Sequence, residues 1–321
     1  MTVRRLGQRL MRLLGVRYPV IQGGMAWVAD AQLAAAVSNA GGLGTIASAH
    51  LTPDQLRTEI RAARNMTAMP FGVNIMLMSP NAGEAARVCC EEGVAVVTTG
   101  AGHPGELMDE LAVAGIIVIP VIASIAQAKR AASAGASAVI AEGYEAGGHV
   151  GELTTMALVP QVVDAVDVPV VAAGGIADGR GAAAAFCLGA SGVQLGTAFV
   201  VARECTAHSN YKRMVVSASD SDTQVTGRSV GHPVRALKNR FTRELARLER
   251  EGADPDTVMS FGLGSLARAV RDGDVERGSV MAGQIAGLVN KEKTALEIVI
   301  GIIQEAEEIL ASITVKEDRY P

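Results

Sequence analysis

Aromatic residues are scarce in this 321-residue chain, which has one Trp, four Tyr and five Phe. Its core must therefore be filled mainly by aliphatic side chains. Neither sign of charge dominates, because 29 basic and 33 acidic residues leave a net charge of −4; such a chain has no overall positive field for holding nucleic acid. A disordered or collagen-like chain is also excluded, since 49% of the residues are hydrophobic and only 19% are charged. The 36 Gly instead indicate close approaches of the backbone in a compact core.

Long hydrophobic runs are absent as well. No apolar stretch approaches the roughly eighteen residues of a membrane-spanning helix. The leading segment, Arg4–Val16, is interrupted by Arg9 and Arg12 and lacks a small-residue cleavage site, so we interpret it as an amphipathic first helix of a cytoplasmic protein. The few cysteines lack the spacing of metal ligands and are predicted to be reduced and mostly buried, as in the cytosol; they are Cys89, Cys90, Cys187 and Cys205.

What the sequence does contain is a regular alternation. Short runs rich in Val, Ile and Gly recur about every 25 residues, each followed by an Ala-rich segment with helical spacing, which is typical of βα units around a parallel sheet. The predicted strands are Tyr18–Gly24, Gly42–Ala47, Phe71–Met76, Ala95–Gly100, Ile116–Ile122, Ala138–Glu142, Val168–Ala173 and Gly192–Val200. The helices predicted between them include Ala29–Ala40, Thr52–Arg64, Ala82–Glu92, Ile125–Ala134 and Gly179–Leu188. No break in the rhythm marks the switch point of an open sheet, so we predict an α/β fold, a TIM (β/α)8 barrel, over residues 1–202.

The rhythm stops after the eighth strand. Residues 203–278 are charged and irregular, and we predict a lid or small subdomain there, with a helix-like stretch at Val234–Glu251. Apolar helical character resumes at Ser279–Val289 and at Thr294–Ile313. Residues 279–321 are therefore predicted to form C-terminal helices that pack back on the barrel.

The carboxyl ends of the predicted strands, where a TIM barrel places its active site, are rich in glycine. Strands seven and eight end in Ala172–Gly175 and Gln194–Thr197. Backbone N–H groups at this place commonly hold a phosphate, and glycine lets the anion come close. The absence of Lys and Arg there suits a mononucleotide phosphate held by backbone amides. The alternative is that these glycines only make tight turns.

One histidine stands out. His149 lies among glycines in the loop after the sixth strand, where a planar ligand can approach, and its ordinary pKa suits proton transfer near neutrality. Glu142 and Glu145 precede it and allow two interpretations, a paired acid and base or anchors that hold the loop by accepting N–H bonds. No acidic or histidine cluster has the spacing of metal ligands, so an organic cofactor is favoured. The remaining histidines are predicted to be structural or solvent-facing: His50, His103, His208 and His232.

Several of the same segments carry a resemblance to a known family. They are Gln22–Ala29 (QGGMAWVA), Phe71–Met76 (FGVNIM), Val97–Gly102 (VTTGAG), Ala141–His149 (AEGYEAGGH), Ala172–Gly179 (AAGGIADG) and Ser279–Gly287 (SVMAGQIAG). Together they resemble the flavin-dependent enoyl-acyl carrier protein reductases of the FabK type and, more distantly, the nitronate monooxygenases. The similarity covers about Tyr18–Val289, and the EAGGH element is shared by both groups.

The resemblance implies FMN in the barrel mouth, with His149 as the catalytic residue beside it. NADH or NADPH would supply a hydride that passes through FMN to the β-carbon of a trans-2-enoyl thioester, while His149 protonates the α-carbon or stabilises the enolate. A monovalent cation is a further expectation, without assigned ligands. The residues that would bind FMN are Gly23, Gly24, Met25, Asn74, Glu142, Gly147, Gly148, Ala173, Gly174, Gly175, Gln194, Leu195, Gly196, Thr197, Met281 and Gln284.

The resemblance also implies an acidic acyl carrier protein as the partner that presents the substrate, in fatty acid biosynthesis. Between Arg228 and Arg250 there are seven basic residues against two Glu, which is either a docking stripe for that partner or a solvated helix face. The apolar Ser279–Val289 segment either contributes to a homodimer, which we expect, or simply covers the barrel. The alternative functions are a nitronate monooxygenase, which would use oxygen and need no NADH, and a flavin-binding protein without catalysis.

Overall fold

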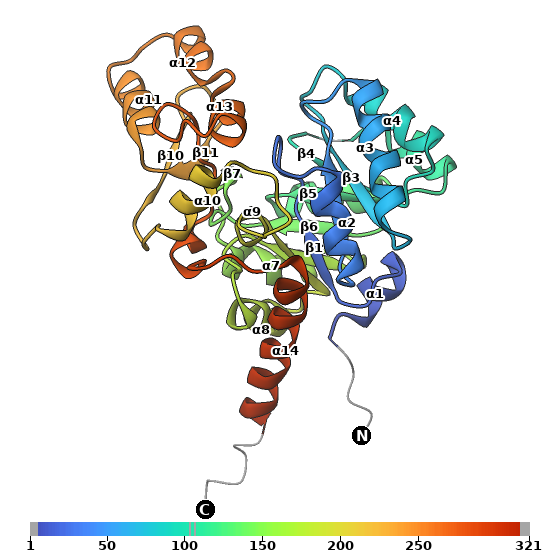
Figure 1. Ribbon diagram of the computed structural model, residues 1–321. Helices are drawn as coiled ribbons and strands as arrows, with labels where there is room; N and C mark the ends of the chain where they lie inside the picture. Colours follow the sequence, from blue (N-terminus) through green and yellow to red (C-terminus); the bar gives the residue numbers. More distant parts are fainter. Residues whose placement is uncertain (1–5, 103, 106, 315–321) are drawn as a thin grey trace, which may run out of the picture.

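The predicted barrel is confirmed. In the computed structural model, which describes residues 6–102, 104, 105 and 107–314, eight parallel strands follow one another in the order β1-β9-β8-β6-β5-β4-β3-β2 (Figure 1). The ring closes between its first and last strands, where Gln22 N–H donates to the Leu43 carbonyl and Leu43 N–H donates to that of Val20, both at 2.9 Å. The strands are β1 Val20–Gln22, β2 Gly44–Ala47, β3 Phe71–Met76, β4 Val96–Gly100, β5 Ile117–Ile122, β6 Val139–Glu142, β8 Val170–Ala173 and β9 Gly192–Leu195.

Helices cover the outside of this barrel, and local capping chemistry sets where several of them begin. The Asp30 carboxylate accepts the N–H of Leu33 at the start of α2, and Thr52 and Gln55 form a reciprocal capping box at the start of α3. The helices are α1 Gln8–Leu14, α2 Ala31–Asn39, α3 Pro53–Met66, α4 Ala82–Glu91, α5 Leu107–Val113, α6 Ile125–Ser133, α7 Thr155–Val163 and α8 Gly179–Cys187.

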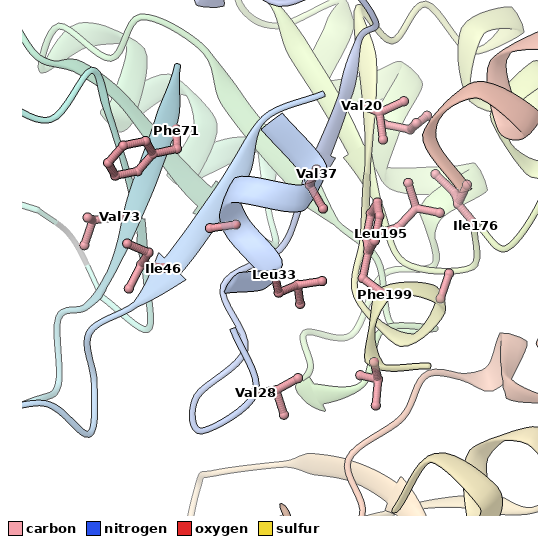
Figure 2. Close-up of a cluster of buried hydrophobic side chains, with 14 of the residues drawn as sticks. Val20, Val28, Leu33, Val37, Ile46, Phe71, Val73, Ile176, Leu195 and Phe199 are labelled. Atoms are coloured by element: carbon pink, nitrogen blue, oxygen red, sulfur yellow. The ribbon is translucent and has the colours of Figure 1, made fainter. Parts of the chain in front are cut away.

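The core has two layers, because each strand is buried on both faces. Inside the barrel lie inward-facing side chains such as Ile21, Val96, Ile119 and Val171, with Leu10 of α1 packed against them. The outer layer lies between strands and helices. Figure 2 shows part of it, where α2 and α9 contribute to one cluster with the strands; the side chains include Val20, Leu33, Val37, Ile46, Leu195 and Phe199. The near-continuous Val and Ile runs of the sequence thus have a direct structural cause.

The strand predicted to continue to Val200 is wrong in its second half. β9 ends at Leu195, the chain leaves the extended conformation at Gly196, and a short helix, α9, spans Thr197–Val200. Short apolar runs of this kind suit a buried strand and a buried helix equally, so periodicity alone does not separate them. The break matters for function, because it places Gly196 and Thr197 at the mouth of the barrel.

A small subdomain follows the barrel and stands beside its mouth (Figure 1). Its three-stranded antiparallel sheet has the order β10-β11-β7, and β7, Gly148–His149, comes from the barrel loop after β6. The helix predicted over Val234–Glu251 is wrong at its beginning, because β11 pairs with β7 and β10, and Asn239 then caps the helix α11. The other elements are α10 Ser209–Val216, β10 Thr223–Thr226, β11 Val234–Leu237, α11 Arg240–Arg250, α12 Pro255–Gly262 and α13 Ser265–Arg271.

The return segment, Ser279–Val289, also differs from its prediction as a helix. It is largely irregular and contains only a 3-10 turn, η1, at Gln284–Leu288. The C-terminal helix α14, Ala295–Thr314, agrees closely with the prediction of Thr294–Ile313 and packs on α8, where Glu305 accepts the N–H of Gly179 at 2.8 Å. Within the described ranges, no helix has the length and apolar character needed to cross a membrane.

Candidate active site

The carboxyl ends of the barrel strands surround a cavity of about 360 Å³. His149 and the residues predicted to bind FMN line it, with one exception. Gln284 lies outside the lining, whereas its neighbours Gly283 and Ile285 belong to it. Strand-end positions in the sequence therefore located most of the cavity wall, because parallel strands bring all their carboxyl ends to one rim.

The wall after β1 is held by amide hydrogen bonds. The Gln22 side chain, fully buried in the barrel, accepts the N–H of Thr45 at 2.9 Å and thereby ties β1 to β2. Asn74 of β3 donates to Thr98 of β4 at 3.0 Å and lies directly against Gly24. The Gly23–Met25 turn thus rests on a fixed polar layer rather than on a mobile loop.

The ends of β8 and β9 form an open cradle. Gly174 and Gly175 have φ angles of 87° and 73°, which L side chains rarely adopt. A Cβ at Gly175 or Gly196 would meet no atom nearer than 3.5 Å, so each glycine leaves cavity space where a side chain would stand. Thr197 Oγ1 accepts the N–H of Gly283 at 2.9 Å and keeps its own proton to donate to a ligand.

The two carboxylates after β6 have different roles. Glu145 accepts the backbone N–H and the hydroxyl of Thr155, at 2.9 and 3.0 Å, and so anchors the start of α7. The anchoring interpretation holds for Glu145. Glu142 instead lines the cavity, where loss of hydration raises the pKa of its carboxyl to about 7. The pair is therefore not a matched acid and base.

The raised pKa of Glu142 predicts a pH dependence of stability. The folded protein holds the Glu142 proton more tightly than the unfolded chain does. Protonated Glu142 therefore favours the folded state at low pH, and this contribution to the free energy of unfolding is lost as the pH rises from about 4.5 to about 7. We expect Glu142→Gln to remove this loss and to stabilise the ligand-free protein above pH 7 by about 2–3 kcal/mol relative to wild type. Urea unfolding of both proteins at pH 5 and pH 8 measures the difference, and a constant offset at both pH values would contradict it.

His149 is presented to the cavity by a two-residue strand. Its neighbour Gly148 pairs with Arg235, and His149 itself pairs with Val234, so the small subdomain fixes the backbone of the loop after β6. Partial burial lowers the pKa of His149, and the nearby His232 lowers it further. The sequence predicted His232 to be structural or solvent-facing, and its proximity to His149 had no sequence signal because it lies far from His149 along the chain.

Tyr144 joins the same loop to the subdomain. Its ring lies under the guanidinium groups of Arg235 and Arg228, at 4.6 and 5.7 Å from the ring centre. Arg235 also donates to the Tyr144 carbonyl at 3.1 Å, and Arg228 donates to the Tyr144 hydroxyl at 2.9 Å. Two of the basic residues between Arg228 and Arg250 are therefore engaged in holding the loop after β6.

The return segment closes the cavity from above. Tyr211, fully buried in α10, donates its hydroxyl proton to the Met281 carbonyl at 2.8 Å. The N–H of Gln284 donates to the Glu145 carbonyl at 2.9 Å. This hydrogen bond ties the return segment to the loop after β6, although Gln284 itself does not line the cavity. The role of Tyr211 had no sequence signal, because a buried Tyr in a charged segment resembles any other core residue.

The other described histidines are structural. His50 stacks on Trp27 with ring centres 4.2 Å apart and accepts the N–H of Trp27; burial and Arg271 lower its pKa to about 4. His208 caps α10 by accepting the N–H of Asn210. His103 lies outside the described residues. In the part of the chain that the structure describes, no group of three or more His, Cys, Asp or Glu side chains has the arrangement of a metal site.

The chain is similar over nearly its whole length to several known proteins, in sequence and in fold. The FabK structure from Thermotoga maritima matches with a TM-score of 0.94 and 49% identity, over 98% of this chain and 99% of that one. A nitroalkane oxidase from Streptomyces ansochromogenes matches with a TM-score of 0.83 and 32% identity, over 95% and 100%. A (3aS,4S,5R,7aS)-5-hydroxy-7a-methyl-1-oxo-octahydro-1H-indene-4-carboxyl-CoA dehydrogenase from Mycobacterium tuberculosis is 35% identical, over 94% and 96%. The nitronate monooxygenase family model matches residues 7–305, so the chain belongs to the nitronate monooxygenase family.

Proposed function

We propose that this protein is an FMN-dependent enoyl-acyl carrier protein reductase. The observation that carries the proposal is the 49% identity to the Thermotoga maritima FabK structure over 98% of the chain, which includes both the barrel and the small subdomain. The identities to the nitroalkane oxidase and the CoA dehydrogenase are 32% and 35%. The family alone does not separate these chemistries, since a shared fold and cofactor serve several reactions.

The residues of the cavity fit FMN. Gly175 and Gly196 leave room for a phosphate, and the Thr197 hydroxyl has a proton to donate to it. Asn74 and the backbone of the Gly23–Met25 turn would hold the edge of a planar ring. Bound FMN would accept a hydride from NADH or NADPH and deliver it to the β-carbon of the enoyl thioester.

His149 would complete the reduction by proton transfer. It lines the same cavity as the predicted ring-binding residues, and its backbone is fixed on both sides of the loop by β11 and by Tyr144. A proton from His149 to the α-carbon, or a hydrogen bond to the enolate oxygen, balances the negative charge left after hydride addition. Met281 and the return segment would exclude water from this step.

Only some of the seven basic residues between Arg228 and Arg250 are free to receive an acidic carrier protein. Arg228 and Arg235 are engaged at Tyr144, and Arg247 is paired with Glu244 and Glu251 in exposed ion pairs. The basic residues that remain exposed on α11 are Arg240, Arg243 and Arg250. We assign the carrier protein to this face of α11. The homodimer, the monovalent cation and the choice between NADH and NADPH stay predictions.

The proposed function is tested by the colour of the purified protein under anaerobic conditions. We expect a yellow protein whose flavin absorbance is bleached by NADH or NADPH and is restored by crotonyl thioester, because the two half-reactions share one cofactor. Bleaching by a nitronate with little response to NADH would instead identify a nitronate monooxygenase. A yellow protein that responds to none of these would be a flavin-binding protein without catalysis.

A further inference from the structure

The cavity has a polar end and an apolar end. Its polar side chains come mainly from the end of β6 and the loop after it and from the end of β9; they are Glu142, Glu145, His149, Gln194 and Thr197. In the ring of eight strands, β3 stands opposite β8, with β2 and β4 on either side of it. The lining from this opposite side, from the turn after β1 and from α13, apart from Asn74, carries no polar side chain: Ala26, Val28, Ala47, Ala49, Met76, Gly100, Ala101 and Leu266. We call these residues the apolar end.

Backbone strain marks the same end. Among the residues that the structure describes, two non-glycine residues have positive φ angles, Trp27 at 68° and Ala101 at 54°. Ala101 lines the apolar end, and Trp27 lies between Ala26 and Val28, which also line it. Such strain persists only where the surrounding structure holds it, and it is common at binding and active sites. The Trp27 ring contacts that of His50, and the Arg271 guanidinium lies 4.1 Å from its ring centre.

A substrate of the proposed reaction must satisfy three conditions in this cavity. Its β-carbon lies at the ring, near His149; its thioester leads out to a carrier protein in solvent; and its acyl chain needs a surface without charged groups. The phosphate cradle at β8 and β9 excludes the chain from the polar end. Resting on the proposed function, we propose that the apolar end binds the acyl chain and that Ala49 and Met76 set the chain length that the enzyme accepts.

The test compares chain lengths on the flavin-loaded enzyme. Ala49→Phe fills the apolar end, and each methylene group that it displaces lowers kcat/KM about fourfold. We therefore expect kcat/KM for a ten-carbon trans-2-enoyl thioester to fall at least tenfold, and that for the four-carbon thioester to change less than twofold. Met76→Ala enlarges the same end and shifts the preference toward longer chains. Met156→Ala, at a methionine 70% exposed on α7, is the matched control and leaves the profile unchanged.

A second measurement separates this inference from the proposed function. Saturated four- and ten-carbon acyl thioesters are titrated into the oxidised holoenzyme, and binding is followed by the shift of the flavin spectrum, which requires no turnover. If the wild-type enzyme reduces no enoyl thioester, the proposed function is wrong, but the ratio of the two Kd values still tests the apolar end. If Ala49→Phe weakened the binding of the four-carbon and the ten-carbon thioester by the same factor, with unchanged flavin content, the inference would be overturned.

Discussion

Replacing His149 with Ala is expected to lower kcat for enoyl thioester reduction by about 10²–10⁴-fold, the usual contribution of a positioned general acid. The flavin content and its bleaching by NADH should be retained, because His149 contributes neither to the glycine cradle nor to the fixed Gly23–Met25 turn. Stopped-flow absorbance separates the two half-reactions: only the second, which needs the proton, should slow. Full turnover in this variant would rule out His149 as the proton source.

The pH profile supplies an independent readout of the same role. Burial and His232 lower the pKa of His149, so protonated His149 is lost already below its ordinary value of 6.5. If the imidazolium donates the proton, kcat falls as the pH rises through this lowered pKa. His232→Ala removes the repulsive charge and should move the fall to higher pH without loss of flavin. A profile identical to that of wild type would show that the limiting proton does not come from His149.

The barrel could be predicted from the sequence because its signals are local. A strand such as Val170–Ala173, buried on both faces, shows its full apolar run, and the following helix α8 shows its Asp178 cap within a few residues. The glycines at the ends of β8 and β9 are local signals as well. The prediction fails where a residue's conformation depends on a distant partner.

The loop after β6, which carries His149, illustrates this limit. Gly148–His149 becomes a strand only because Val234 and Arg235 pair with it, more than eighty residues later in the chain. The same pairing turns the start of the predicted helix Val234–Glu251 into β11. Arg235, which a charge count assigns to the surface, is buried against Tyr144. Sequence reasoning therefore placed His149 at the mouth of the barrel, but it did not predict the strand pairing that fixes its backbone.

The largest structural effect is expected at Gly24. A Cβ at this position would lie 2.2 Å from the Cβ and Cγ of Asn74, far inside contact distance. Asn74 cannot withdraw without breaking its hydrogen bond to Thr98, so the Gly23–Met25 turn must shift instead. We expect Gly24→Ala to cost about 1–3 kcal/mol of stability, as overpacking does, and to weaken FMN binding at least tenfold. Flavin fluorescence titration and thermal unfolding measure the two effects separately.

Gly83 provides the matched control for this substitution. A Cβ there would meet no atom within 4 Å, and the residue lies in α4, where Ala is a better helix former than Gly. Gly83→Ala should therefore raise the melting temperature slightly and leave the flavin affinity unchanged. If Gly24→Ala instead retained wild-type flavin affinity, the contact between Gly24 and Asn74 would not form part of the cofactor site. Because both variants add one methyl group, their difference isolates that contact from any general effect of losing a glycine.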